Sequence, residues 1–304
     1  MGIASTPRAF EVVLPTRSFA ALDLQSIFVL GSDGNLWLER APFGNVPPSR
    51  NQVDGNVLAF QPLDVSRVFV LGSDGNLWLE QEPFGVIPPS RQQIDGNVSA
   101  FQGLDSLNVI VLGRDGKLWL ERAPFGHAPP ARAQIDGNVR AFEALDAETV
   151  VVLGTDGKLW LEHAPFGQVP PARQEIDANV ASFKALDNQT IVVLGTDGKL
   201  WLEHGPFGNI PPVRQQIDGN VSAFAPLDSQ HLLVLGTDRN LWLERAPFGK
   251  VPPAREHIDG NVRAFQGLNS DRVFVLGTDG KLWLEQAPFG TVPPARQQVD
   301  GNVA

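Results

Sequence analysis

Short runs of apolar residues alternate with turn-forming residues along the chain, and the alternation recurs with a fixed period. Each run is rich in β-branched and aromatic residues and is bounded by Gly, Pro, Asn or Asp, which is typical of β-strands. All seven tryptophans lie 41 residues apart, each within the tetrapeptide Leu-Trp-Leu-Glu. The pattern therefore predicts an all-β protein made of tandem copies of one unit, and the near-identity of the copies indicates recent amplification or deliberate engineering.

The second copy of the unit shows the strands that the pattern predicts. They are Val57–Leu63, Val68–Leu71, Leu77–Glu80 and Ser90–Ile94. The link Gly72–Asn76 predicts a tight hairpin in which Gly75 has a positive φ. Side chains on the third strand alternate between two sides, with leucines on one side and Trp78 and Glu80 on the other. Both faces of the sheet are therefore largely apolar.

A sheet that is apolar on both faces must be covered on both, and radial stacking of four-stranded blades achieves this. Repeats of about 40–45 residues with four strands are typical of propellers. The sequence thus predicts a seven-bladed β-propeller of four-stranded antiparallel blades, as a single domain over residues 1–304. Residues 17–304 hold the seven repeats. Residues 1–16 form an N-terminal segment in which Phe10–Leu14 is a candidate closing strand.

Two copies depart from the repeat in their turns. Arg239 stands where the other hairpins have glycine, and Ala178 replaces the glycine of Asp-Gly-Asn. Because positive φ is costly for arginine, we expect that hairpin to change type and Asn240 to take the strained position. The alanine indicates that its connector does not need positive φ.

Composition narrows the classes of partner. The net charge is −10, and the basic residues are spread singly along the repeat, which argues against nucleic acid and anionic membranes. The absence of cysteine excludes disulfides and Cys-based zinc sites. The N-terminus lacks the apolar core of a signal peptide, and no run is long enough to insert into a membrane. We expect a cytoplasmic protein or one released without a signal peptide.

Polar residues that recur in the units are the candidates for a site. Glu121 and Arg132, with their equivalents, are expected to pair across strands as structural groups. The tryptophans are candidate plates for a sugar ring, and the Asp and Asn of the connector are candidate hydrogen-bonding groups, although such residues also stabilise turns and cores. The candidate ligand-binding residues are Trp37, Trp78, Trp119, Trp160, Trp201, Trp242, Trp283, Asp54, Asp95, Asp136, Asp177, Asp218, Asp259, Asn56, Asn97, Asn138, Asn179, Asn220 and Asn261.

No catalytic pattern accompanies these residues. An active site needs unlike groups that converge once, whereas this chain repeats like groups. The five histidines show no metal-ligand spacing, and no phosphate loop or activated serine motif is present. We expect no enzyme activity, no cofactor and no metal ion.

The central hairpin resembles a known repeat. The segments Val68–Trp78 and Val273–Trp283 are similar to the repeat of the Photorhabdus-type seven-bladed propeller lectins and, more loosely, to tectonin and tachylectin repeats. The resemblance covers the hairpin of each unit, and it implies the propeller fold and sugar binding. Of the tryptophans that help to line sugar sites in that family, it extends to the Trp78 position and its equivalents.

Two functions follow from these features. The first is a multivalent lectin-like protein with several equivalent sites for glycans, in which avidity strengthens weak single sites. The second is a structural or protein-interaction scaffold with no small-molecule ligand, in which variable loop residues contact a protein partner. These variable positions are Asn45, Val86, His127, Gln168, Asn209, Lys250 and Thr291.

Overall fold

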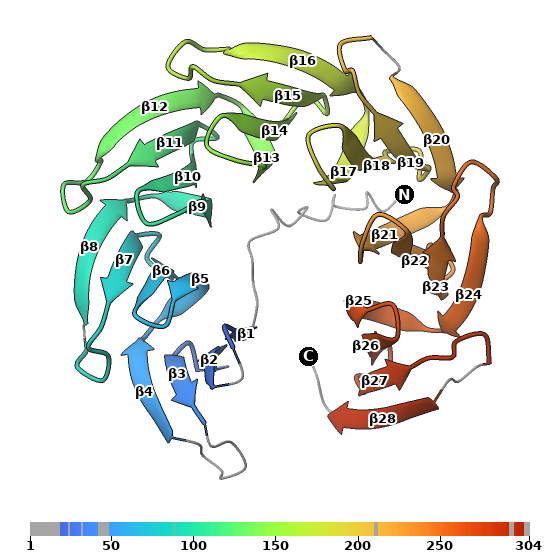
Figure 1. Cartoon of the computed structure of the whole chain (residues 1–304), viewed down its shortest axis with the longest axis horizontal. Coiled ribbons are helices and arrows are strands. Elements are labelled where there is room, and N and C mark those ends of the chain that lie inside the picture. The colour runs from blue at the N-terminus through green and yellow to red at the C-terminus, as the bar shows by residue number, and fades with distance from the viewer. Residues whose placement is uncertain are drawn as a thin grey trace, which may run out of the picture. The chain divides into compact units, whose positions relative to one another are not determined.

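The structure is a computed structural model of the chain, and it describes residues 19–23, 25–31, 33–41, 49–87, 89–209, 212–291 and 295–300. Strands and turns make up these ranges, and the described strands form seven four-stranded antiparallel sheets. We call the sheets blades 1 to 7 in chain order (Figure 1). The fold is a seven-bladed β-propeller, as the repeat predicts. No helix in the described ranges is long and apolar enough to cross a membrane.

Two compact units divide the chain, Met1–Thr155 with Glu162–Arg173 and Asp156–Leu161 with Gln174–Ala304. The first unit contains blades 1 to 3 and the second contains blades 5 to 7, and the division passes through blade 4. The single domain over the whole chain stays a prediction. The candidate closing strand Phe10–Leu14 lies outside the described residues.

Within each blade, neighbouring strands follow chain order from one edge of the sheet to the other. Blade 1 contains β1 (Phe19–Ala21), β2 (Ser26–Leu30), β3 (Leu36–Arg40) and β4 (Ser49–Asp54). Blade 2 contains β5 (Val57–Asp64), β6 (Arg67–Gly72), β7 (Leu77–Gln81) and β8 (Ser90–Asp95). Blade 3 contains β9 (Val98–Gly103), β10 (Asn108–Gly113), β11 (Leu118–Arg122) and β12 (Ala131–Asp136). Blade 4 contains β13 (Val139–Ala144), β14 (Thr149–Gly154), β15 (Leu159–His163) and β16 (Ala172–Asp177).

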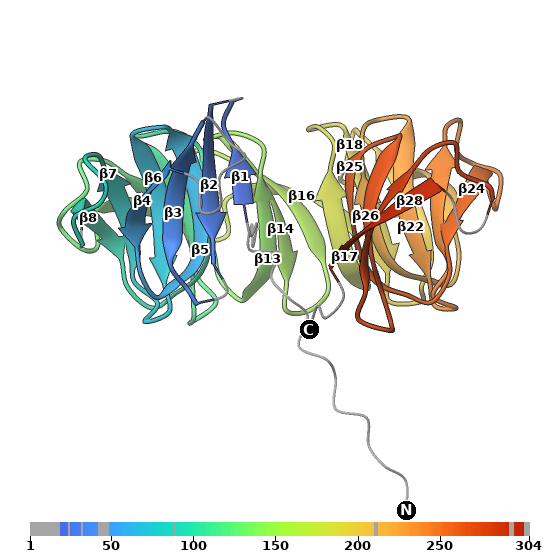
Figure 2. The same cartoon turned by 90° about the horizontal axis from the view of Figure 1, so that it is seen from below.

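The later blades repeat the same plan. Blade 5 contains β17 (Val180–Ala185), β18 (Thr190–Gly195), β19 (Leu200–His204) and β20 (Val213–Asp218). Blade 6 contains β21 (Val221–Pro226), β22 (His231–Gly236), β23 (Leu241–Arg245) and β24 (Ala254–Asp259). Blade 7 contains β25 (Val262–Asn269), β26 (Arg272–Gly277), β27 (Leu282–Gln286) and β28 (Ala295–Asp300). Figure 2 shows the strands of single blades, such as β1 to β4, lying beside one another.

The four strands predicted for the second copy are confirmed, since each differs from β5, β6, β7 or β8 by no more than a residue at either end. The hairpin between β6 and β7 is confirmed as well. Gly75 has a φ of 83°, and its amide donates to the carbonyl oxygen of Gly72 at 2.9 Å.

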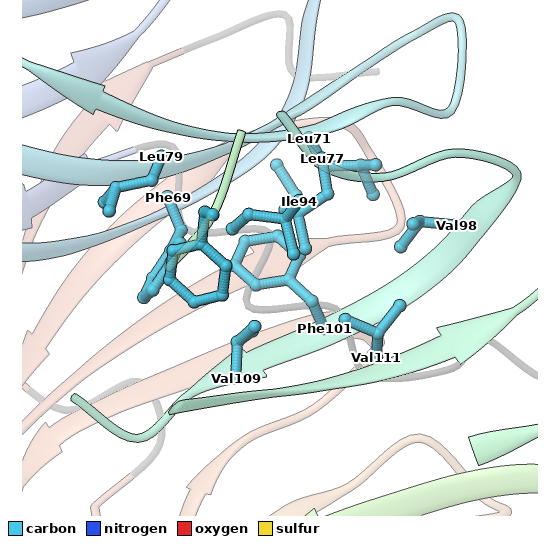
Figure 3. Close-up of a cluster of buried hydrophobic side chains, with 11 residues drawn as sticks. Phe69, Leu71, Leu77, Leu79, Ile94, Val98, Phe101, Val109 and Val111 are labelled. Carbon is cyan, nitrogen blue, oxygen red and sulfur yellow. The ribbon is translucent and has the colours of Figure 1, made fainter. Parts of the chain in front are cut away.

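Apolar side chains cover both faces of a blade. On β6, Phe69 and Leu71 face blade 3, where they pack with Phe101 of β9 in a buried cluster (Figure 3). The next residues along the same strand, Val68 and Val70, belong to the buried cluster shared with blade 1. Consecutive residues along the strand therefore contribute to the two different interfaces on either side of the blade. This explains the continuous apolar runs in the sequence.

A β-bulge recurs between the third and fourth strands. Leu77 pairs with Asp95, but Trp78 pairs with Gln93, so Ile94 is the extra residue of β8. Ile94 is fully buried. A bulge changes the direction of the side chains beside it, and here it occurs next to Asp95, whose carboxylate reaches the following blade.

The connector between blades needs one left-handed residue, and asparagine supplies it. Asn56, Asn97, Asn138, Asn179, Asn220 and Asn261 have φ values of 56–58°. Ala178 has no positive φ, which confirms the prediction for that connector. The prediction for Arg239 is wrong, because Arg239 itself has a φ of 67°. The hairpin keeps its hydrogen bond from the Arg239 amide to the carbonyl oxygen of Gly236, at 3.0 Å, so the backbone of the turn prevails over the preference of the side chain.

Candidate functional site

The tryptophans lie on the third strand of each blade and are partly buried. In six blades an arginine of the fourth strand covers the ring. In blade 3 the guanidinium carbon of Arg132 is 4.1 Å from the centre of the Trp119 ring. The same stack, at 4.1–4.2 Å, joins Arg50 to Trp37, Arg91 to Trp78, Arg214 to Trp201, Arg255 to Trp242 and Arg296 to Trp283. This geometry is a cation–π contact, and it occupies one face of each of these rings.

Two acidic side chains lie beside the arginine that covers the tryptophan. Nη1 of Arg132 is 3.2 Å from Oδ2 of Asp95, which belongs to the preceding blade. The same nitrogen is 3.6 Å from Oε1 of Glu121 on the neighbouring strand, where the two residues are register partners. The predicted pairing of Glu121 with Arg132 is therefore confirmed. We call Glu121, Arg132 and Asp95 an interblade triad.

Five further triads repeat these contacts, with arginine–aspartate distances of 3.1–3.4 Å and arginine–glutamate distances of 3.7–3.9 Å. Each joins the aspartate of one blade to the arginine and glutamate of the next. They are Asp54, Arg91 and Glu80; Asp136, Arg173 and Glu162; Asp177, Arg214 and Glu203; Asp218, Arg255 and Glu244; and Asp259, Arg296 and Glu285.

Burial decides the charge of the glutamate. Glu121 has no exposed surface, and neither of its oxygens accepts a hydrogen bond from a described residue. Burial raises the pKa of Glu121 to about 9, the nearby Asp95 carboxylate adds to the rise, and Arg132 opposes it. A neutral glutamate leaves one carboxylate for one guanidinium, so each triad carries no net charge inside the fold.

The candidate aspartates and asparagines also serve the backbone. Oδ1 of Asp95 accepts a hydrogen bond from the amide of Gly96 at 2.7 Å, while Oδ2 pairs with Arg132. The carbonyl oxygen of Asn97 accepts a hydrogen bond from the amide of Arg114 in the next hairpin, at 2.8 Å. The same amide-to-carbonyl bond is present at Asn56, Asn138, Asn179, Asn220 and Asn261.

In the second unit, one hollow of about 330 Å³ brings the three kinds of candidate residue together. Trp201, Asp177 and Asn179 line it, beside the hairpin residues Asp197 and Lys199. Lys199 Nζ is 2.8 Å from Oδ2 of Asp197. The hollow offers carboxylate, amide and ammonium groups near an indole, and a polar ligand could contact these groups. Arg214 also lines this hollow, and its guanidinium lies over the ring of Trp201.

Sequence reasoning paired the arginine with the glutamate but missed that the arginine covers the tryptophan. The signal was present, because an arginine follows every Pro-Pro pair at the same distance in all seven units. A recurring cation with a recurring aromatic ring is the pattern that a structural cation–π stack would produce. In the described part of the chain, no group of three or more His, Asp and Glu side chains is placed to hold a metal ion.

The variable loop residues lie between the third and fourth strands. Val86, His127, Gln168, Asn209, Lys250 and Thr291 are exposed, whereas Asn45 lies outside the described residues. The loop itself is anchored. Phe84 is 7% exposed and packs edge-on against Phe28 of blade 1, with 6.2 Å between ring centres. The amide of Gly85 in blade 2 donates to the carbonyl oxygen of Gln52, which also belongs to blade 1, at 2.8 Å.

Comparison with known proteins extends to the fold. No protein-family profile and no curated protein sequence matches the chain. Among solved structures, the computationally designed Ika8 protein is similar, with a TM-score of 0.59 and 15% identity over 92% of this chain and 84% of that one. The C-terminal WD40 domain of Sif2 has a TM-score of 0.57 and 12% identity over 87% of this chain and 79% of that one. Hsv2 of Kluyvelomyces marxianus has a TM-score of 0.57 and 10% identity over 91% of this chain and 95% of that one.

These neighbours include a WD40 domain and a designed protein, and they do not single out lectins. At such low identity they show the fold alone. The fold that the resemblance to propeller lectins implies is confirmed, and sugar binding stays a prediction. The chain has the fold of a seven-bladed β-propeller.

Proposed function

We propose that the protein is a non-catalytic interaction scaffold, in which the loops between the third and fourth strands bind a protein partner. The observation that carries the proposal is a contrast between two sets of residues. The recurring residues contact one another, in triads at six junctions between blades and in stacks in six blades. The variable residues that the structure describes are exposed at the tips of anchored loops.

The loop tips have the properties of contact residues. Val86 is 68% exposed. Ile87, Val169 and Val251, which share one repeat position, are 47–50% exposed. Exposed β-branched residues that neighbouring prolines and a buried phenylalanine hold in place lose little entropy on binding. An apolar side chain amid polar neighbours is a common feature of protein-binding surfaces.

The competing function is sugar binding in hollows such as the one at Trp201. A pyranose stacks on an open aromatic face, and the arginines already cover one face of the ring in six blades. In five of these blades, moving the arginine aside would break its ion pair with the aspartate of the preceding blade. These contacts favour the scaffold over the lectin.

A paired set of variants tests the proposal. One carries Ile87→Ser, Val169→Ser and Val251→Ser at the loop tips, and the control carries Lys117→Gln, Lys199→Gln and Lys281→Gln in the opposite hairpins. A partner found by crosslinking is purified, and its affinity for wild type and both variants is measured. We expect the loop variant alone to bind at least tenfold more weakly. Binding to a dense glycan surface that is lost in Trp201→Ala would show that the lectin function is correct instead.

A further inference from the structure

A polar hollow of about 660 Å³ lies in the second unit where blade 7 meets blade 6. Arg245 and Glu256 of blade 6 line one part of it, and Asn269, Arg272 and Gln286 of blade 7 line another. Arg245 and Arg272 occupy two positions that recur at each junction between consecutive repeats. Both positions hold arginine at two junctions, the one between blades 6 and 7 and the one between blades 1 and 2.

The junction between blades 1 and 2 shows how the fold satisfies two such arginines. Arg40, the equivalent of Arg245, forms a close ion pair with Glu82 of blade 2. Arg67, the equivalent of Arg272, binds Oδ2 of Asp64 through Nε at 2.9 Å and Nη2 at 2.6 Å. Two internal carboxylates therefore bind two guanidinium groups at that junction.

Both carboxylates are missing between blades 6 and 7. Asn269 stands at the position of Asp64, and Ala287 stands at the position of Glu82. Arg245 has other partners, since its Nη2 is 3.3 Å from Oε1 of Glu256 and its Nη1 is 3.0 Å from Nε2 of His231. Asn269 turns its Oδ1 to the amide of Asp271 at 2.9 Å.

Arg272 has no such replacement. Its side chain is exposed, and no acid in the described ranges lies within ion-pair distance of its guanidinium. The shortened side chain of Ala287 lines the hollow beside it. Compared with the junction between blades 1 and 2, the junction between blades 6 and 7 thus has both guanidinium groups but lacks the two carboxylates that bind them.

We propose that this hollow binds the carboxylate of an acidic side chain from a protein partner, with Arg272 as its ion-pair partner. A guanidinium can donate two hydrogen bonds to one carboxylate, and at the equivalent position Nε and Nη2 of Arg67 both donate to Oδ2 of Asp64. The amides of Asn269 and Gln286 supply further donors. The inference rests on the proposed function and names the chemistry of one contact that a partner makes.

The surroundings favour a protein segment with few acidic residues. A single carboxylate fills a small part of 660 Å³, so the rest of the hollow can take neighbouring groups of the same segment. Val251, which is 50% exposed, lies in the loop that joins the strands of Arg245 and Glu256. The net charge of −10 and the nearby Asp271 repel a strongly acidic segment. One or two acidic residues beside an apolar residue fit these features best.

Titration of the full chain with a capped Gly-Glu-Val-Glu-Gly peptide tests the inference, with the Nε–H signal of Arg272 followed by NMR. We expect a saturable shift with this peptide and none with its Gln counterpart. Arg272→Gln should weaken binding at least tenfold, whereas Arg67→Gln at the equivalent position should leave it unchanged. The double variant Asn269→Asp with Ala287→Glu restores the internal carboxylates and should abolish binding without lowering stability.

Three outcomes would overturn the inference. They are an absent shift at Arg272, equal shifts with the Glu and Gln peptides, or undiminished binding by the double variant. A shift of equal affinity with acetate alone would show a site for small carboxylates and not for a protein segment. If the peptide does not bind but the loop-tip variant still loses its partner, the proposed scaffold function stands and only the Arg272 site is refuted. If the peptide binds at Arg272 but the loop-tip variant keeps its partner, only the proposed role of the loops is refuted.

Discussion

Replacing Glu121 with glutamine separates a neutral buried carboxyl from an ionised one. Glutamine has the shape of a protonated glutamate and cannot ionise. Burial raises the pKa of Glu121 from its ordinary value of 4.5 to about 9, so the folded protein holds a proton at neutral pH that the unfolded chain releases. The contribution of this glutamate to the free energy of unfolding is therefore full below the unfolded pKa of 4.5. It is lost as the pH rises from there through the folded pKa of about 9.

The size of the effect follows from one proton. Between the two pKa values, each unit of pH lowers the free energy of unfolding of the wild type by about 1.4 kcal/mol for this glutamate. Glu121→Gln lacks this dependence. Relative to wild type, the variant should therefore gain about 1.4 kcal/mol per pH unit as the pH rises from about 6 to about 8.

Denaturant unfolding of both proteins across this pH range measures the difference, and the carboxyl ¹³C shift of Glu121 reports its protonation directly. A difference in unfolding free energy that stays constant with pH would refute the reasoning, because Glu121 would then be ionised in the fold. A loss of about 3–5 kcal/mol in Glu121→Gln at every pH would indicate a broken charged pair. The other triads titrate in the same direction, since burial raises the pKa of Glu80, Glu162, Glu203 and Glu244 to about 9 and that of Glu285 to about 8.

Three further substitutions test the packing and the turns. Glu121→Ala should lower the free energy of unfolding by about 1–3 kcal/mol through the cavity that it leaves, while Arg132 keeps its aspartate and tryptophan contacts; an unchanged denaturation midpoint would contradict this. Arg239→Gly should raise stability by about 0.5–1 kcal/mol, because glycine adopts a φ of 67° without strain; a lower melting temperature would count against it. Asn138→Val should cost about 1–2 kcal/mol, since a β-branched residue resists a φ of 57°; urea unfolding measures the loss.

The sequence predicts the fold well because the repeat reports each position several times. The Leu-Trp-Leu-Glu strand and the Gly75 hairpin follow from alternation and turn chemistry, which act within a few residues. The prediction at Arg239 failed because the hydrogen bonds of the hairpin outweigh the local preference of one side chain. Local patterns alone do not reveal such a balance.

The candidate site was harder to predict, because its contacts join residues far apart in the chain. The pairing of Glu121 with Arg132 could be inferred from adjacent strands, but the contribution of Asp95 depends on the bulge at the end of β8 and on contact between blades. That Arg272 lacks an ion-pair partner within the described ranges becomes visible only by comparison with Arg67, which binds Asp64. That comparison needs the distances between side chains as well as the repeat.

The triads and loop bonds give each junction within a unit a direction. The earlier blade supplies the acceptors, such as the Asp95 carboxylate and the carbonyl oxygen of Gln93, and the later blade supplies the donors, Arg132 and the amide of Gly126. A fragment cut between blades would expose the acceptors of these triads and loop bonds at its C-terminal end and their donors at its N-terminal end. Such fragments are complementary head to tail, so they should associate by heterologous contacts and not as two-fold dimers. Split at a connector, the propeller offers a pair of fragments that recognise each other through charge as well as apolar surface.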